Sequence, residues 1–313
     1  MEMPLVSYVL TAYNIENFIE ESVKCAFNQT YQNLEIVLSD DCSTDKTFDI
    51  MKKMADEYKG PHKIVLNRNE KNMGISQHMS KCYIELASGE IIIAAHGDDV
   101  SVPERTQISV DFLLEHPEYT AVSMGVIATD KNGLPIKTKE HNATVDEFHS
   151  YDFETGGNIP APSRAFLKKV MTIFGTLNHD CPTEDELITF RALMLGKNAF
   201  LPEIGVYYRK HESSNSNPEY FDRFPLEKIL KQQNDDMEKA VEFGLITKEQ
   251  KAAKYNELYK GMVIRKRYRC YFADRSISNL IKLIRPNDIS LRGKLSYIKS
   301  HIKYLMAVST DKK

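Results

Sequence analysis

The chain has 313 residues, of which 42% are hydrophobic and 27% are charged, so it can bury a sizeable core and is not a disordered protein. Its formal net charge of -3, from 41 basic and 44 acidic residues, excludes the net basic domain typical of nucleic-acid binding, and we expect no nucleic-acid partner. The sequence contains neither a stretch apolar enough to span a membrane nor an N-terminal signal-peptide pattern, so we expect a cytoplasmic protein.

Four short apolar segments in the first third of the chain alternate with helical patterns. Their β-branched content and near-continuous hydrophobicity favour strands buried on both faces of a mostly parallel sheet, over residues 5–10, 34–38, 63–66 and 91–95. Helices are predicted from Ile15, from near Ser43, and after the Gly74 turn as far as Gly89. This alternation predicts an α/β fold with right-handed crossovers.

The middle of the chain is less regular, and its last third is helical. A strand is predicted at 120–127, followed by helical runs at 162–175 and 183–197. After Asn217 the pattern is helical throughout, so we place a domain boundary there: residues 1–216 form the α/β domain and residues 217–313 a helical, basic C-terminal region.

All four predicted strands end in polar clusters, which include Thr11–Asn14, Asp40–Asp41, Asn72 and Asp98–Asp99. Parallel strands present their carboxyl ends at one edge of a sheet, where ligands bind. The sequence has neither a GxGxxG loop after the first strand nor a GK[ST] loop, so neither common phosphate cradle is present. A divalent cation shared by carboxylates and a nucleotide diphosphate would explain why two adjacent acids, Asp98 and Asp99, are kept together.

The ordered segments VSYVLTAYN, LEIVLSDDCSTDKT, NMGISQ, IIIAAHGDDVSVPERT and CPTEDELITFRALMLGK resemble the family 2 inverting glycosyltransferases of GT-A fold. The resemblance covers about the first two thirds of the chain. It implies a Rossmann-like, mostly parallel central sheet flanked by helices, with an α-helical C-terminal extension. It also implies a nucleotide-sugar donor, with UDP-sugar as the expected class, and a glycan or lipid-linked saccharide acceptor in surface polysaccharide synthesis.

The resemblance assigns roles at the donor site. Thr11 and Tyr13 would frame the nucleotide base, Asp41 would hydrogen-bond the uracil edge, and Asp98 would lie near the ribose. Arg209 would neutralise phosphate charge. The donor-binding set is therefore Thr11, Tyr13, Asn14, Asp40, Asp41, Asn72, Asp98 and Arg209. For Asp40–Asp41 a purely structural helix-capping turn remains an alternative.

The resemblance also implies a metal site and a catalytic pair. Asp99 would ligate Mn²⁺ or Mg²⁺, and His211 would contact the metal or the diphosphate, whereas His96–Gly97 precede the acids where the commoner DxDD motif has its first acid. Asp185 is the expected general base and Glu184 the second candidate. Acids are also favoured at a helix N-terminus by the macrodipole, so this pair has a structural alternative.

The segment 261–306 contains eleven Lys and Arg residues against two acids, a local balance of +9, interleaved with aromatic and aliphatic side chains. Such helices can lie on an anionic membrane surface, which would place the protein peripherally at the inner face of the plasma membrane. The alternative is a helical appendage packed on the catalytic domain with a solvated basic face.

These patterns predict a metal-dependent, inverting glycosyltransferase. The rival from another class is a non-catalytic nucleotide-sugar binding or scaffolding protein with a degenerate site, favoured by the missing first acid of the metal motif. The Glu184–Asp185 pair favours the enzyme. A nucleotidyltransferase would need a basic loop after the first strand, which TAYNIEN does not provide.

Overall fold

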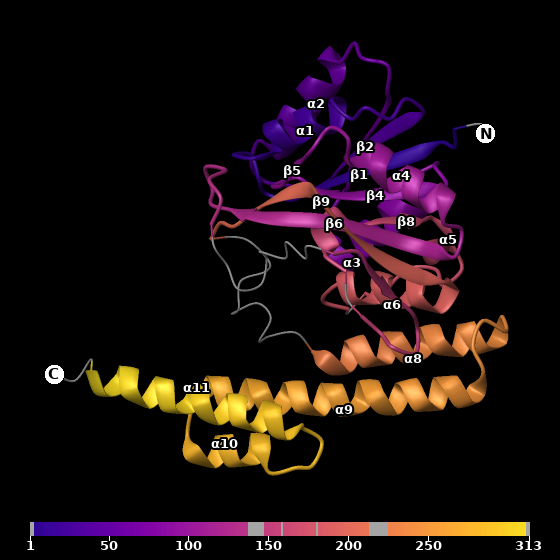
Figure 1. Ribbon diagram of the computed structural model, residues 1–313. Helices are drawn as coiled ribbons and strands as arrows, with labels where there is room; N and C mark the ends of the chain where they lie inside the picture. The colour runs from indigo at the N-terminus through magenta and orange to yellow at the C-terminus, as the bar shows by residue number, and fades with distance from the viewer. Residues whose placement is uncertain (1–2, 137–146, 158, 180, 213–224, 311–313) are drawn as a thin grey trace.

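The computed structural model describes residues 3–136, 147–157, 159–179, 181–212 and 225–310. Within them a nine-stranded sheet runs in the order β3-β2-β1-β4-β8-β6-β9-β5, and β7 pairs with β9. Helices flank this sheet, and four further helices lie beneath it as a separate layer (Figure 1). The mixed α/β architecture with a helical C-terminal region confirms the predicted fold class.

The first half of the sheet is parallel and consists of β1 (Val6–Ala12), β2 (Leu34–Asp40), β3 (Lys63–Arg68) and β4 (Ile91–His96). β1 pairs with β2 and β4, and β2 pairs with β3, all in parallel. The four predicted strands are therefore confirmed, and their carboxyl ends meet at one edge. The expectation that all are buried on both faces is wrong for β3, which is only half-buried because it is the last strand of the sheet order.

Four helices follow these strands: α1 (Ile19–Phe27), α2 (Thr47–Glu57), α3 (Ile75–Lys81) and α4 (Arg105–Glu115), with α3 continuing as a π-helical turn at Cys82–Leu86. The apolar face of α1 is buried against the sheet through Ile19, Val23 and Ala26. α1 begins four residues later than predicted because the backbone N–H of Ile15 donates to Thr47 Oγ1 at 2.8 Å, which ties the preceding loop to α2.

The second half of the sheet contains β5 (Val100–Ser101), β6 (Tyr119–Thr129), β7 (His149–Tyr151), β8 (Ala165–Leu167) and β9 (Lys197–Arg209). The predicted helix at 162–175 is wrong over β8, and the only helix between β8 and residue 175 is the short α5 (Lys169–Thr172). Phe166 pairs with Ile92 of β4 and Ala121 of β6 and is fully buried, so long-range pairing overrides the local helical spacing. The predicted helix at 183–197 is confirmed as α6 (Asp185–Leu195).

The C-terminal region consists of α8 (Leu226–Glu242), α9 (Lys248–Ala273), α10 (Ile277–Ile284) and α11 (Leu291–Thr310). α8 packs against α6 and α9, and α10 packs against α9 and α11, so these helices form a layer under the sheet (Figure 1). A capping box between Thr247 and Gln250 starts α9. The predicted boundary at 216/217 lies outside the described residues and stays a prediction.

A buried ion pair fastens this layer to the α/β domain. Arg191 of α6 and Asp236 of α8 are both fully buried, and the guanidinium donates to the carboxylate at 2.8 and 2.9 Å. Asp236→Ala leaves a buried cation without its partner, so we expect a loss of about 3–5 kcal/mol in the free energy of unfolding, measured in urea. Asp235→Ala removes a more exposed ion pair on the same helix and should cost about 1 kcal/mol or less. Equal losses in the two variants would contradict this.

Candidate active site

The loops after β1 and β2 form one side of the polar site at the carboxyl ends of the parallel strands. Asn14 has a left-handed φ of 50°, and its side-chain Oδ1 accepts the backbone N–H of Thr44 at 2.8 Å. The backbone N–H of Asn14 donates to Ser43 Oγ, also at 2.8 Å. Thr11 is buried at the end of β1, whereas the ring of Tyr13 is 46% exposed. This side therefore offers one solvent-facing aromatic ring on a rigid loop.

Asp40 and Asp41 have different environments although they are adjacent. Asp40 is fully buried and accepts the backbone N–H of Ser43 at 2.9 Å, with Arg68 3.6 Å away. Asp41 is also buried, and its carboxylate accepts Asn69 Nδ2 at 2.8 Å and the backbone N–H groups of Met73 and Gly74 at 2.9 and 3.0 Å. Asp40 thus stabilises the turn before α2, and Asp41 holds the loop after β3.

Asn72 lies in that same loop, where its Oδ1 accepts the backbone N–H of Gly74 at 2.9 Å. Gly74 has a φ of 75°, in the left-handed region that favours glycine, and the loop turns there into α3. Asn72 is therefore brought to the same edge as Asp41, on the far side of the loop that Asp41 fastens.

The fourth strand end joins the end of β9. Asp98 Oδ2 lies 3.0 Å from His211 Nε2, and Asp99 Oδ1 accepts the backbone N–H of Arg209 at 2.9 Å. The Arg209 guanidinium donates to the backbone oxygen of Asp98 and to the carboxylate of Glu21, and it stacks on the Phe18 ring at 4.9 Å. The predicted residues Asp98, Asp99, Arg209 and His211 therefore lie together, although Arg209 and Asp98 are 111 residues apart in sequence.

Asp99 is the member of this group whose carboxylate is not fully hydrogen-bonded. It is 5% exposed, and its second oxygen, Oδ2, has no hydrogen-bond partner. Burial, together with the neighbouring charge of Asp98, raises the pKa of Asp99 well above its ordinary range. Burial also acts on Asp98, but the hydrogen bond with His211 and the charge of His96 outweigh it and lower the pKa of Asp98.

An orphaned, buried carboxylate oxygen beside an ionised carboxylate fits a divalent cation, which would satisfy Asp99 Oδ2 and relieve the repulsion from Asp98. Across the described residues, no three His, Cys, Asp or Glu side chains form a complete ligand set. Magnesium typically takes only one or two protein carboxylates when substrate phosphates supply further oxygens, so the residues present fit such an ion.

The acidic pair at the start of α6 is also asymmetric. Glu184 is 3% exposed and its Oε2 has no hydrogen-bond partner, so burial and the charge of Asp185 raise its pKa well above the ordinary range. Asp185 has a side chain that is 47% exposed and lies 3.9 Å from Arg164 Nη1. Glu184 is therefore the member that holds a proton, and Asp185 is the solvent-facing carboxylate. This supports the expected order of the two candidates without testing their roles.

Sequence reasoning did not identify Arg164 and Glu21. Both act through contacts with segments that are distant in the chain, and neither stands in a recognisable motif: Arg164 follows the short 3-10 turn Ala161–Ser163, and Glu21 is an ordinary helix-surface acid. Arg164 stands immediately before the apolar residues that form β8. A charged residue at the start of a buried strand would have been a signal, but residues 162–175 were assigned to a helix, so it was missed.

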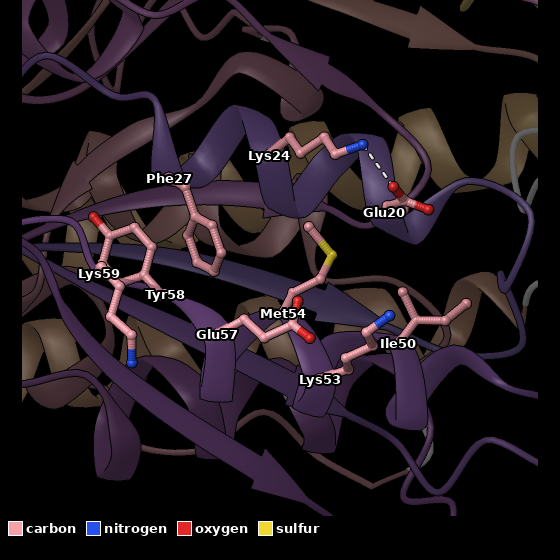
Figure 2. Close-up of a pocket in the computed structure, with 9 residues that line it drawn as sticks. All are labelled: Glu20, Lys24, Phe27, Ile50, Lys53, Met54, Glu57, Tyr58 and Lys59. Atoms are coloured by element: carbon pink, nitrogen blue, oxygen red, sulfur yellow. Dashed lines mark hydrogen bonds and ion pairs between the residues drawn. The ribbon is translucent and has the colours of Figure 1, made fainter.

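Two cavities accompany the fold. One, of about 440 Å³, lies between α6, α8 and α9, with Asp185 and Thr183 on its wall beside Leu226, Leu258 and Arg265. The other, of about 470 Å³, is a groove between α1 and α2, and the Lys24–Glu20 ion pair runs along its α1 wall (Figure 2). Of the predicted site residues, Asp185 lines the first cavity and none lines the second, so the first cavity adjoins the candidate base.

The comparisons with known proteins identify the family. The model of glycosyl transferase family 2 matches residues 7–173, more than half of the chain. The chain belongs to glycosyl transferase family 2. The match includes the four parallel strands and the Asp98–Asp99 pair, and it ends before Glu184–Asp185 and His211.

Curated family 2 relatives match parts of the chain. EpsE of Bacillus subtilis (strain 168), which is named as a glycosyltransferase, is 35% identical over 131 residues, which is 42% of this chain and 46% of EpsE. The Escherichia coli protein WfaP, named as a UDP-Glc:alpha-D-GlcNAc-diphosphoundecaprenol beta-1,3-glucosyltransferase, is 33% identical over 111 residues, covering 36% of this chain and 42% of WfaP. The chain thus spans less than half the length of these two relatives.

Solved structures share the GT-A fold. Residues 1–349 of S. aureus TarS in complex with UDP-GlcNAc superpose with a TM-score of 0.65 at 17% identity, covering 90% of this chain and 78% of that chain. The mannosyltransferase PcManGT of Pyrobaculum calidifontis, in complex with GDP-Man and Mn²⁺, has a TM-score of 0.60 at 17% identity, covering 96% and 81%. At this identity the likeness shows the fold alone.

Proposed function

We propose that this family 2 protein is a metal-dependent, inverting glycosyltransferase that moves a sugar from a UDP-sugar to a hydroxyl of a glycan or lipid-linked acceptor in surface polysaccharide synthesis. The observation that carries the proposal is the pair of contrasted acidic sites near the end of β4, with the buried Asp99 Oδ2 lacking a hydrogen-bond partner and the Asp185 side chain half-exposed at the start of α6. The charges of Asp98 and Asp185 both act on His96 at the end of β4, so the two sites adjoin.

On the donor side, different side chains contact different parts of the nucleotide. The exposed ring of Tyr13, with Thr11 and Asn14, frames the base, and Asp41, next to Asp40, addresses the base edge. Asp98 lies by the ribose, and Asn72 and Arg209 contribute polar groups at the margins of the site. UDP is favoured as the nucleotide because UDP complexes occur among the structural neighbours.

Asp99, with His211 beside it, would hold the Mn²⁺ or Mg²⁺ ion. When bound, the ion neutralises charge on the departing diphosphate. Asp99 supplies the orphaned Oδ2, and Asp98 keeps His211 in place through the 3.0 Å contact. A PcManGT complex that contains Mn²⁺ adds support from the same fold.

On the acceptor side, Asp185 takes the proton of the attacking hydroxyl, and that oxygen displaces the diphosphate in one in-line step that inverts the anomeric carbon. Glu184 remains protonated and does not compete for the role. The 440 Å³ cavity beyond Asp185 is the proposed acceptor site. Its walls come from both parts of the chain, residues 1–216 and 217–313, which we propose as the two domains.

The competing function is nucleotide-sugar binding without catalysis. It is favoured by His96, which stands where the commoner motif has an acid. Incubation with UDP-sugars and Mn²⁺, followed by measurement of released UDP, separates the two. Slow donor hydrolysis that Asp185→Asn abolishes supports the enzyme, and tight UDP binding without any UDP release supports the binding protein.

We also propose peripheral attachment to an anionic membrane, at the inner face of the plasma membrane. Over the described residues, no helix is long and apolar enough to cross a bilayer. Instead, exposed apolar side chains of α10 and α11 stand beside exposed cations, as at Ile281–Lys282, Leu291–Arg292 and Ile302–Lys303. This combination fits a surface on which apolar side chains enter the headgroup region and cations meet anionic lipids.

The full chain is expected to sediment with phosphatidylglycerol vesicles at low salt and not with phosphatidylcholine vesicles. Charge reversal of Lys282, Arg292 and Lys303 to Glu should weaken binding by about 100-fold or more, because each cation near the surface contributes roughly 1 kcal/mol. Reversal of the exposed Lys52, Lys53 and Lys59 near α2 removes the same charge and should change binding little. Similar losses in both triple variants would refute a specific surface.

A further inference from the structure

Arg164 is a buried cation without a hydrogen-bonded partner for most of its guanidinium. Its side chain is 2% exposed, and neither Nε nor Nη2 has a hydrogen-bond partner. Burying a guanidinium in this state is costly, and buried arginines are ordinarily paired with a carboxylate. Arg191 in the same protein illustrates the ordinary case, since Asp236 accepts two of its N–H groups.

The backbone of Arg164 is held firmly, so the unpaired state does not come from a loose segment. Its N–H donates to the Ala161 oxygen at 3.1 Å, and its own carbonyl oxygen accepts the N–H of Ala94 in β4 at 3.0 Å. The guanidinium of Arg105 also donates to that oxygen, at 3.3 Å. The backbone of Arg164 is thus anchored immediately before β8, and its side chain reaches to within 3.9 Å of Asp185 at the start of α6.

Asp185 lies beside this guanidinium without bonding to it. Its carboxylate shares a hydrogen bond with the side chain of Glu184, and its buried Oδ1 lies 3.9 Å from Arg164 Nη1, which is too far for a hydrogen bond. The Asp185 side chain is half-exposed and can turn, whereas Arg164 is enclosed. Two of the cations that line the adjoining cavity pair with other acids: Arg265 donates twice to Glu186, and Lys254 pairs with Glu257.

We propose that Arg164 is a positioning residue for the reaction: when the acceptor enters, the half-exposed Asp185 side chain turns its Oδ1 onto the enclosed guanidinium, which keeps that carboxylate ionised and its other oxygen aimed at the acceptor hydroxyl. The inference rests on the proposed function. It adds a residue that neither the acidic motif nor the family match assigns. It also gives the half-exposed carboxylate of the pair a cation 3.9 Å away, whereas burial is the main reason that the pKa of Glu184 is raised.

Asp185 faces several titratable groups besides Arg164. Glu184 precedes it, Tyr83 of the π-helical turn and His96 of β4 feel its charge, and Glu186 lies next to it in α6. Tyr83 is fully buried, and burial raises its pKa well above the ordinary range, so it stays neutral. Burial lowers the pKa of His96, which favours its neutral form. Among these neighbours, Arg164 is the group that carries a positive charge at every pH of the assay, and it lies 3.9 Å from the Asp185 carboxylate.

The test is the pH dependence of kcat/KM for the full chain and for Arg164→Met and Arg164→Lys, with UDP release as the assay. Without the positive charge the ionised carboxylate is less favoured, so in Arg164→Met activity should appear only at higher pH. The acidic limb should move up by about one pH unit, the low end of the ~1–3 units typical of a neighbouring opposite charge. Arg164→Lys, which keeps the charge, should restore most of the parent limb. The donor KM should be unchanged.

Asp236→Asn provides the control for stability, because it weakens the buried Arg191 pair without touching Arg164 or Asp185. Its acidic limb should coincide with that of the parent, and thermal unfolding of each variant verifies that it is folded at the assay temperature. If Arg164→Met is unfolded, Arg164→Gln takes its place, because it also removes the charge but keeps a polar side chain, and the same upward shift of the acidic limb is expected.

Three results would overturn the inference. An unshifted acidic limb in a folded Arg164→Met would show that the guanidinium does not act on the base. A raised donor KM with an unshifted limb would place Arg164 at the donor phosphates instead. A parent without turnover on any nucleotide sugar would remove the proposed function and this inference with it, whereas parent turnover with an unshifted limb removes the inference alone.

Discussion

Asp185→Asn is expected to lower kcat by about 10²–10⁴-fold while leaving the affinity for UDP unchanged. The amide keeps the shape of the side chain and cannot take a proton from the acceptor hydroxyl. Asp185 is the half-exposed member of the pair and lies on the wall of the 440 Å³ cavity, so its loss affects the acceptor side of the reaction and not the nucleotide. UDP release measures the rate, and calorimetric titration of UDP measures the affinity.

Glu184→Gln is the matched comparison for Asp185→Asn. Burial keeps Glu184 protonated, and glutamine resembles a protonated glutamate, so this variant should lose much less activity than Asp185→Asn. The reverse order would exchange the two roles. Near-normal turnover of Asp185→Asn would remove Asp185 from the reaction, and loss of UDP binding in that variant would mean that it supports the donor site.

Asp99→Asn is expected to remove the metal dependence of UDP binding. In the parent, the Kd for UDP measured with Mn²⁺ should be far lower than the Kd measured with EDTA. In Asp99→Asn the two values should coincide near the EDTA value, a loss above about 100-fold, because losing even an outer-shell partner of a metal typically costs ~10–100-fold. The reason is the orphaned Oδ2, the buried oxygen available to a cation.

The sharpest control for Asp99→Asn is Glu35→Gln. Glu35 is a second buried carboxylate on the same sheet, where it accepts Ser7 Oγ at 2.6 Å, but it lies at the start of β2 and so at the opposite edge from Asp99. Glu35→Gln should lose stability and keep metal-dependent UDP binding. Metal-dependent binding of UDP that survives in Asp99→Asn would assign the cation to other groups. Equal affinity of the parent for UDP with Mn²⁺ and with EDTA would argue against a metal-dependent donor site.

The parallel half of the fold could be predicted because its signals are local. Each strand is a short apolar run, and each following helix has its own periodicity, so β1 to β4 were located to within two residues at most ends. Once the strands are parallel, the polar residues after them must share an edge, which is why Thr11, Asp41 and Asp98 were grouped correctly without coordinates.

The second half was harder because its strands are defined by their partners. β8 is three residues long and sits antiparallel between β4 and β6, and its sequence has helical spacing on both sides. β9 returns the chain to the site from residue 197, so His211 was assigned to the metal or the diphosphate from the family resemblance and not from any local pattern, and its contact with Asp98 came only from the structure. Arg164 was missed for the same reason.

The sequence by itself determined the α/β class, the positions of the first four strands along the chain and the set of acids that follow them, because hydrophobic periodicity is a property of each segment. The order of the strands in the sheet came from the structure. Only the tertiary structure decided what each acid does. Asp40 is paired in a turn, Asp41 fastens a loop, Asp99 keeps an unsatisfied oxygen, and Glu184 is buried while Asp185 is half-exposed. Burial and partner charge set the ionisation of a carboxylate, and both arise from segments that meet only after folding.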